Sequence, residues 1–248
     1  MAEKKQKKSE FFRTLILAIL IAMGIRTFLF ESFRIPSGSM INTLLIGDFL
    51  FVNKFSYGYG KYSFPFGLAP FRGRLLYTQP QRGDVVVFRT DKQPGMDFIK
   101  RVVGLPGDTI QVKDGILHIN DVPVELEPTG ETTYVDQDGE HYTATVYKET
   151  LPNGVSHPIV LDEPLGQGSY DNTLVYHVPE GHFFMMGDHR HRSGDSRDLK
   201  HMGFIPSDYL VGEASLIYFS IDNCSPGFWK LWEWPLRIRW DRLLTLIR

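Results

Sequence analysis

The chain has 248 residues, of which 42% are hydrophobic, and a formal net charge of −2 at pH 7. This size suits one globular domain or two small ones with an appendage, and the near-neutral charge gives no bias toward a nucleic-acid partner. The single cysteine, Cys224, excludes an intrachain disulfide, and nothing around it resembles an activated thiol. The 18 Phe, 11 Tyr, 23 Gly and 15 Pro favour a mainly β, turn-rich protein.

A long apolar segment near the N-terminus predicts one transmembrane helix. Residues 1–10 carry four lysines, and residues 11–30 would span about 30 Å as a helix, enough to cross a bilayer. Arg13 and Arg26 lie near the two ends of this segment, where their side chains can reach the headgroups. A cleaved signal peptide also begins this way, but residues 28–33 are bulky where a cleavage site needs small residues. We therefore expect an uncleaved single-pass anchor in the lipid bilayer, with the lysines in the cytoplasm and the rest of the chain outside.

Short apolar segments between turn residues predict β-strands along most of the remaining chain. These segments are 44–56, 85–88, 97–103, 110–112, 116–119, 183–186 and 216–221. Asp114-Gly115 favours a tight hairpin turn between two of them. Residues 57–82 predict a long ordered loop. We expect a β core from residues 31–108 and 182–225, interrupted by a small, variable β subdomain at 109–181.

The C-terminal segment, residues 226–248, predicts an amphipathic helix. Pro235 suits the first turn of a helix that runs to Arg248, and arginines flank an apolar stripe. The stripe consists of Leu236, Trp240, Leu243, Leu244 and Ile247. Such a helix would lie on an anionic membrane surface, and the alternative is a helix that packs on the core and closes the β domain.

A short loop after the apolar segment offers a candidate nucleophile. Ser39 follows Ser37 and Gly38, and Pro36 stiffens the entry to this loop. A serine hydroxyl is a weak nucleophile until a base removes its proton. The Ser39 backbone N–H and the Ser37 hydroxyl could together hold a developing oxyanion. The simpler alternative is a flexible Ser-Gly-Ser turn without chemistry.

A lysine within an apolar strand offers a candidate base. Lys100 and Arg101 occupy opposite faces of the strand 97–103, so one basic side chain has apolar neighbours whichever face points inward. Periodicity does not decide between them, but arginine cannot be deprotonated in a protein, so a base must be Lys100. Its pKa would have to fall by about two units, which burial can supply. The alternative is a lysine that extends from a strand edge into solvent.

A polar loop, residues 187–197, follows the apolar strand 183–186 and is typical of a site wall. The histidines near it raise the alternative of a metal site, but their spacing matches no well-known ligand set. We therefore expect no metal and no other cofactor. We also expect single alanine replacements of His189 and His191 to keep most activity.

Together, the Ser39 loop, the Lys100 strand and the 187–197 loop resemble three sequence boxes of bacterial type I signal peptidases. These are membrane-anchored Ser–Lys proteases that remove signal peptides from exported proteins. The resemblance runs from the anchor to about residue 221. It implies a β catalytic core, no cofactor, precursor proteins as partners, and an extracytoplasmic catalytic domain on the bacterial inner membrane.

The resemblance also implies roles for individual residues. Ser39 falls at the nucleophile, Lys100 at the general base and Ser37 at the side-chain oxyanion donor. Ser193 falls at the serine that orients the lysine. The positions that support the site are those of Asp188, Asp195 and Arg197. Small substrate residues before the cleaved bond imply shallow apolar pockets, for which the candidates are Phe33, Ile35, Met40, Leu44 and Ile99.

This chain departs from the family pattern in the 187–197 loop. The family usually has Asn after Gly-Asp and then Arg-Asp-Asn-Ser, whereas here His189 is followed by Arg190-His191-Arg192-Ser193. Residues 198–202 also separate Arg197 from the following Gly-Phe pair. We therefore expect a locally reshaped wall. Asn42 stands where proline is common, which should leave the chemistry unchanged.

Three other functions compete with this interpretation. A Ser–His–Asp hydrolase would pair Ser39 with a histidine and with Asp188 or Asp195. A membrane-tethered β domain could bind peptides without cutting them. A self-cleaving repressor shares the Ser–Lys fold, but a membrane segment stands where its helix-turn-helix would be.

Overall fold

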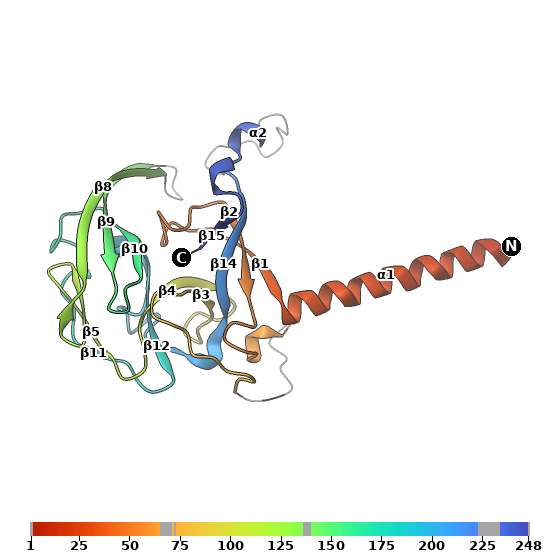
Figure 1. The fold of residues 1–248 in the computed structure, drawn as a ribbon, viewed down its shortest axis with the longest axis horizontal. Coiled ribbons are helices and arrows are strands. Elements are labelled where there is room, and N and C mark those ends of the chain that lie inside the picture. The colour runs from red at the N-terminus through yellow and green to blue at the C-terminus, as the bar shows by residue number, and fades with distance from the viewer. Residues whose placement is uncertain (1, 65–70, 72, 136–139, 223–233, 248) are drawn as a thin grey trace.

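The computed structural model describes residues 2–64, 71, 73–135, 140–222 and 234–247. Helix α1, Ala2–Phe28, contains a span from Glu10 to Phe28 that is long and apolar enough to cross a membrane. The side chains of this span are almost entirely exposed, as those of a lipid-facing helix would be. Figure 1 shows α1 projecting as a single rod from a β-rich body. The predicted mainly β fold, preceded by one apolar helix, is confirmed.

The main sheet has eight strands in the described part of the chain, and each neighbouring pair is antiparallel. Strand β14 comes late in the sequence yet lies between β2 and β3, so a late segment of the chain joins two early parts of the sheet. In spatial order the first seven strands are β1 (Phe30–Arg34), β2 (Asp48–Asn53), β14 (Leu210–Ser220), β3 (Val85–Phe88), β4 (Phe98–Gly104), β12 (His182–Met186) and β13 (Ile205–Pro206). The eighth, β15 (Thr245–Leu246), pairs with β14.

Residues 109–181 form two smaller antiparallel sheets. One contains β5 (Thr109–Lys113), β6 (Ile116–Ile119), β7 (Val122–Pro123) and β11 (Tyr176–His177). The other contains β8 (Glu125–Val135), β9 (His141–Thr150) and β10 (Ser156–Leu161). Short helical turns, η1, η3, η4 and η6, cover Lys61–Ser63, Arg190–Arg192, Ser207–Tyr209 and Trp240–Arg242.

The hairpin predicted at Asp114-Gly115 is present. Asp114 and Gly115 have φ values of 47° and 80°, the left-handed region that a primed turn requires at both central positions. The hairpin buries Ile110 and Leu117 in one hydrophobic cluster with Phe184 of β12. The four-stranded sheet therefore shares its core with the main sheet.

The predicted C-terminal helix is wrong. Helix α2 covers only Trp234–Arg237, after which Ile238 forms a bridge with Ile221 and β15 pairs with β14. Strand β14 is much longer than β3, so part of its edge is left unpaired beyond β3, and β15 fills that edge. The stripe that would have lain on a membrane is consequently broken up. Its last member, Ile247, packs against the hydrophobic core. Residues 226–233 and 248 of the expected segment lie outside the described residues.

Candidate active site

Ser39 and Lys100 meet at the centre of the candidate site. Lys100 Nζ donates a hydrogen bond of 2.5 Å to Ser39 Oγ. Ser39 lies on the turn between β1 and β2, where the Ile41 N–H donates to the Gly38 carbonyl. Lys100 lies in β4, paired with Val86 of β3, and is only 4% exposed. Within the described residues no histidine bonds to Ser39 Oγ, so the geometry favours the lysine pair over a Ser–His–Asp triad.

The surroundings of Lys100 lower its pKa to about 8. Burial is the largest cause, because a charged ammonium loses its hydration there. The carboxylates of Asp195 and Asp188 partly oppose this effect, and Arg197 adds to it. A substantial fraction of Lys100 is therefore neutral at mildly alkaline pH, as a proton acceptor must be.

Two buried ion pairs supply charged groups that act on Lys100. Arg101 forms a fork with Asp188, with bonds of 2.9 and 2.7 Å, and Arg197 forms another with Asp195, with two bonds of 2.8 Å. Burial alone would raise the pKa values of Asp188 and Asp195, but the arginines outweigh it and lower both. Both carboxylates therefore stay charged. Of the adjacent residues on β4, Arg101 forms an ion pair and Lys100 faces the Ser39 hydroxyl, as their chemistry predicts.

Ser193 lies close to the candidate pair but does not bond to the lysine in the described structure. It is buried against Gly187, and a Cβ added at Gly187 would lie less than 3.0 Å from both Ser193 Oγ and the Ser39 carbonyl oxygen. No hydrogen bond joins Ser193 to Lys100 in the described structure. The orienting role of Ser193 therefore stays a prediction. Gly187, which the sequence marks only as a turn residue, is needed for this close approach.

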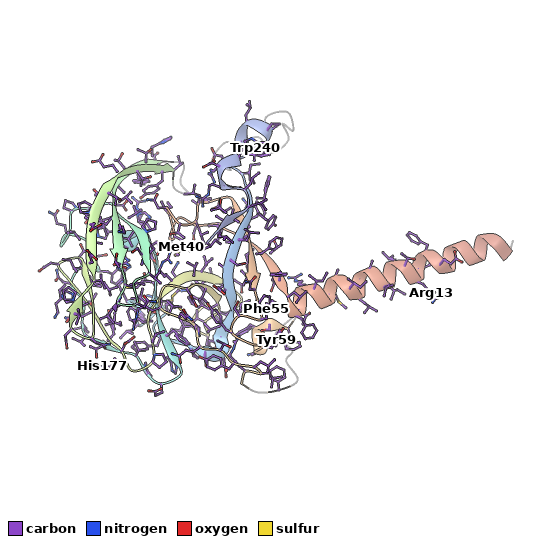
Figure 2. All side chains as sticks on the ribbon, viewed as in Figure 1. Arg13, Met40, Phe55, Tyr59, His177 and Trp240 are labelled. Atoms are coloured by element: carbon purple, nitrogen blue, oxygen red, sulfur yellow. The ribbon has the colours of Figure 1, made fainter. Side chains whose placement is uncertain are left out.

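The candidate pocket residues divide into two groups. Phe33, Ile35 and Ile99 line a cavity of about 230 Å³ beside the Ser39 loop. Met40 and Leu44 have no exposed surface and belong to the hydrophobic cluster that packs beneath these residues. Figure 2 shows Met40 inside the body of the β domain. The first group can contact a ligand, whereas the second supports the wall from within.

Ser37 is half-buried on the same loop, two positions before Ser39. The Ser39 backbone N–H donates no hydrogen bond within the described residues. An unused N–H and a nearby hydroxyl are the donors that an oxyanion would need.

A buried ionic cluster from the 109–181 region was not predicted. Arg190 donates to both carboxylate oxygens of Glu149, at 2.7 Å to Oε1 and closer still to Oε2, and His157 Nε2 lies 3.2 Å from Oε2. Burial would raise the pKa of Glu149, but Arg190 and His157 lower it to about 2. Glu149 and His157 belong to β9 and β10. Their sequence surroundings gave no signal, because a charged residue in a polar strand normally faces solvent.

The histidines in and after the 187–197 loop contact carboxylates of the protein and are not gathered around a common point. His189 and His191 contact Asp162 and Asp171, respectively, and His201 contacts Asp198. Across the described ranges, no three His, Cys, Asp or Glu side chains form a group that could hold a metal ion.

The chain belongs to the signal peptidase family, peptidase S26, whose model matches residues 8–219. Signal peptidase I of Rickettsia typhi is 41% identical over 222 residues, which cover 87% of this chain and 81% of that protein. Signal peptidase I of Rickettsia canadensis is 40% identical over 215 residues, with 84% and 79% covered. A crystal structure of a signal peptidase I from Enterococcus faecalis V583 matches 56% of this chain and 98% of its own, at 26% identity and a TM-score of 0.31. The chain is thus an enzyme of the signal peptidase I class, and the predicted resemblance is confirmed.

Proposed function

We propose that this signal peptidase is a Ser–Lys endopeptidase in which Ser39 is the nucleophile and Lys100 the general base. The observation that carries the proposal is the 2.5 Å hydrogen bond between Lys100 Nζ and Ser39 Oγ. Burial supports it further, because it lowers the pKa of the lysine to about 8 and so makes the neutral amine available.

This geometry supports a two-stage reaction through an acyl ester. Neutral Lys100 takes the proton of Ser39 as Oγ attacks the carbonyl carbon of the scissile peptide bond. The Ser39 N–H and the Ser37 hydroxyl donate to the oxyanion that forms. The ammonium of Lys100 then protonates the leaving amine, and an acyl ester remains on Ser39. Lys100, neutral again, removes a proton from the water that hydrolyses this ester.

The substrate is an exported precursor with small residues before the cleaved bond. The cavity has Arg34 and Asp97 in its lining, but Phe33, Ile35 and Ile99 give it an apolar side, which suits such side chains. Helix α1 anchors the enzyme in the bacterial inner membrane with its N-terminus in the cytoplasm. The β domain then lies on the extracytoplasmic side, where a signal peptide emerges from the bilayer.

The decisive experiment replaces each member of the pair in the full-length enzyme. Ser39→Ala and Lys100→Ala should each reduce cleavage of a secreted precursor to background, and the double variant should be little worse than either. Detergent-solubilised enzyme and a precursor with an Ala-X-Ala site provide the assay. Activity within tenfold of wild type in Lys100→Ala would contradict the proposal, whatever Ser39→Ala does.

A further inference from the structure

His189 holds the loop that carries Ser39. Its side chain is 1% exposed, and its Nδ1 lies 3.3 Å from the Gly38 carbonyl oxygen. A carbonyl oxygen only accepts, so Nδ1 donates in this contact, and a ring that also donates from Nε2 to Asp162 carries a proton on both nitrogens. The backbone N–H of His189 also donates to the carbonyl oxygen of Ser39, at 3.1 Å. One residue therefore holds two successive carbonyl groups of the nucleophile loop.

The Gly38 carbonyl and the Ser39 N–H belong to the same peptide group. That group is planar and trans, so its C=O and N–H point in opposite directions. A hydrogen bond that fixes the Gly38 carbonyl consequently fixes the direction of the Ser39 N–H. This N–H has no acceptor within the described residues and is the backbone oxyanion donor of the proposed mechanism.

The inserted three-stranded sheet holds the His189 ring in place. Nε2 lies 3.1 Å from Asp162 Oδ1 and 3.3 Å from the hydroxyl of Tyr134. Tyr134, on β8, donates to the same carboxylate oxygen at 2.7 Å, and its ring meets the His189 ring edge-on at 5.0 Å. Arg192 donates to the other oxygen of Asp162 at 2.8 Å. Asp162 follows β10 directly, so both contacts to Nε2 come from the 109–181 region.

The charge on Asp162 is maintained in this arrangement. Partial burial raises the pKa of its carboxyl, but the hydrogen bonds from His189, Tyr134 and Arg192 outweigh burial and lower it. A carboxylate that accepts from several donors has little freedom to move. It therefore provides a fixed support for the histidine ring.

We propose that His189 is a positioning residue for the peptidase reaction. Nδ1 fixes the Gly38–Ser39 peptide so that its N–H faces the oxyanion, and Asp162 and Tyr134 hold the ring from the inserted sheet. This inference rests on the proposed Ser–Lys function. It revises the expectation that His189 is dispensable, and it gives the 109–181 region a part in catalysis.

Asparagine offers a test that separates the two sides of the ring. The Nδ2 atom of an Asn side chain occupies nearly the position of His Nδ1, so His189→Asn keeps a donor for the Gly38 carbonyl. It cannot reach Asp162, however, because it lacks the Nε2 atom. His189→Ala removes both contacts, and Asp162→Asn removes the charge that supports the ring.

The variants are measured as full-length enzyme in detergent, with kcat and KM determined on a peptide that carries the cleavage site. Losing alignment of an oxyanion donor costs up to about 10²–10³ in kcat, so we expect His189→Ala to lose about 10–100-fold in kcat with KM within about twofold. His189→Asn should stay within about fivefold of wild type. Asp162→Asn should fall between them, and His189→Ala/Asp162→Asn should be no worse than His189→Ala alone. His141→Ala, on an exposed histidine of the same inserted sheet, is the matched control and should be unaffected.

The outcomes are distinct from those that test the proposed function. If Ser39→Ala is inactive but His189→Ala keeps kcat within threefold, the positioning role alone is wrong. A loss confined to KM overturns it as well, because it indicates a substrate contact. If His189→Ala does not fold, the Asp162→Asn effect is compared in the wild-type and His189→Asn backgrounds. Equal losses there contradict the proposal, and a loss found only with histidine present supports it.

Discussion

At the scale of single residues, the candidate site depends on which buried basic side chain has a carboxylate partner. Lys100 and Arg101 are neighbours on β4, and both side chains are buried. The charge of Arg101 is balanced by Asp188, whereas no carboxylate of the described residues bonds to the Lys100 amine. Burial therefore lowers the pKa of Lys100 from 10.5 to about 8, a shift worth roughly 3 kcal/mol between its two protonation states.

This shift predicts how activity depends on pH. As the proposed base, Lys100 acts only when neutral, so kcat/KM should rise with pH through about 8 and level off above it. Below that pH the lysine is protonated in the folded enzyme, and the rate should fall about tenfold per pH unit. The profile is measured with full-length enzyme in detergent between pH 6 and 10. A rate that is flat across this range, or that falls as pH rises, would contradict Lys100 as the base.

Ser37 offers a second prediction at this scale. An oxyanion donor acts mainly in the transition state, so Ser37→Ala should lower kcat by roughly 10²–10³ and leave KM nearly unchanged. Ser37→Thr keeps the hydroxyl and should recover part of the loss. Steady-state kinetics on a precursor peptide distinguish the alternatives. An effect on KM alone would make Ser37 a binding contact instead.

At the scale of structural elements, the 187–197 loop depends on a glycine at one position and tolerates a side chain at another. A methyl group at Gly187 would meet Ser193 Oγ and the Ser39 carbonyl oxygen, whereas one at Gly194 would meet nothing within 4 Å. Displacing the nucleophile loop by about 1 Å can cost around 10²-fold in rate. We therefore expect Gly187→Ala to lose about 10–100-fold in kcat and Gly194→Ala to remain near wild type. Equal activity of the two variants would show that the loop relaxes without moving Ser39.

The C-terminal segment is joined to the main-sheet region by the hydrogen bonds of Arg242. Arg242 donates to both oxygens of the fully buried Asp48, at 3.2 and 2.6 Å, and to the Thr43 carbonyl. Arg242→Met should destabilise the enzyme by about 1–3 kcal/mol, because Asp48 loses a partner although Ser220 still donates to it. Thermal unfolding in detergent measures the change. Lys113→Met, an exposed lysine at the end of β5, is the control. An unchanged midpoint for Arg242→Met would mean that the hydrogen bonds of Arg242 contribute nothing to stability.

At the scale of the whole molecule, helix α1 leads directly into β1, and the Ser39 loop follows at the far end of that strand (Figure 1). The four lysines of residues 1–10 predict a cytoplasmic N-terminus and an extracytoplasmic β domain. With Cys224 replaced by serine, a cysteine introduced at His141 should react with a membrane-impermeant maleimide when the outer surface of the inner membrane is exposed. A cysteine introduced at Ser9 should react only after the membrane is permeabilised. The reverse pattern would overturn the proposed orientation.

Much of the fold could be predicted because its determinants are local. The apolar span, the strand 85–88 and the Asp114-Gly115 hairpin each depend on neighbouring residues, and all are present. The C-terminal helix was predicted wrongly for the complementary reason. Its apolar spacing is compatible with a helix, but the free edge of β14 and the buried Asp48 draw this segment into a strand and a turn.

The sequence by itself determined the chemical identity of the candidate pair. Only a lysine can act as the base in strand 97–103, and the Ser39 loop is the flexible hydroxyl-bearing segment beside the anchor. Tertiary structure alone decided what supports that pair. The contacts of His189 with Asp162 and of Arg190 with Glu149 join residues far apart in the chain. No local pattern records such partners, because buried polar groups find them only when the sheets pack together and water is excluded.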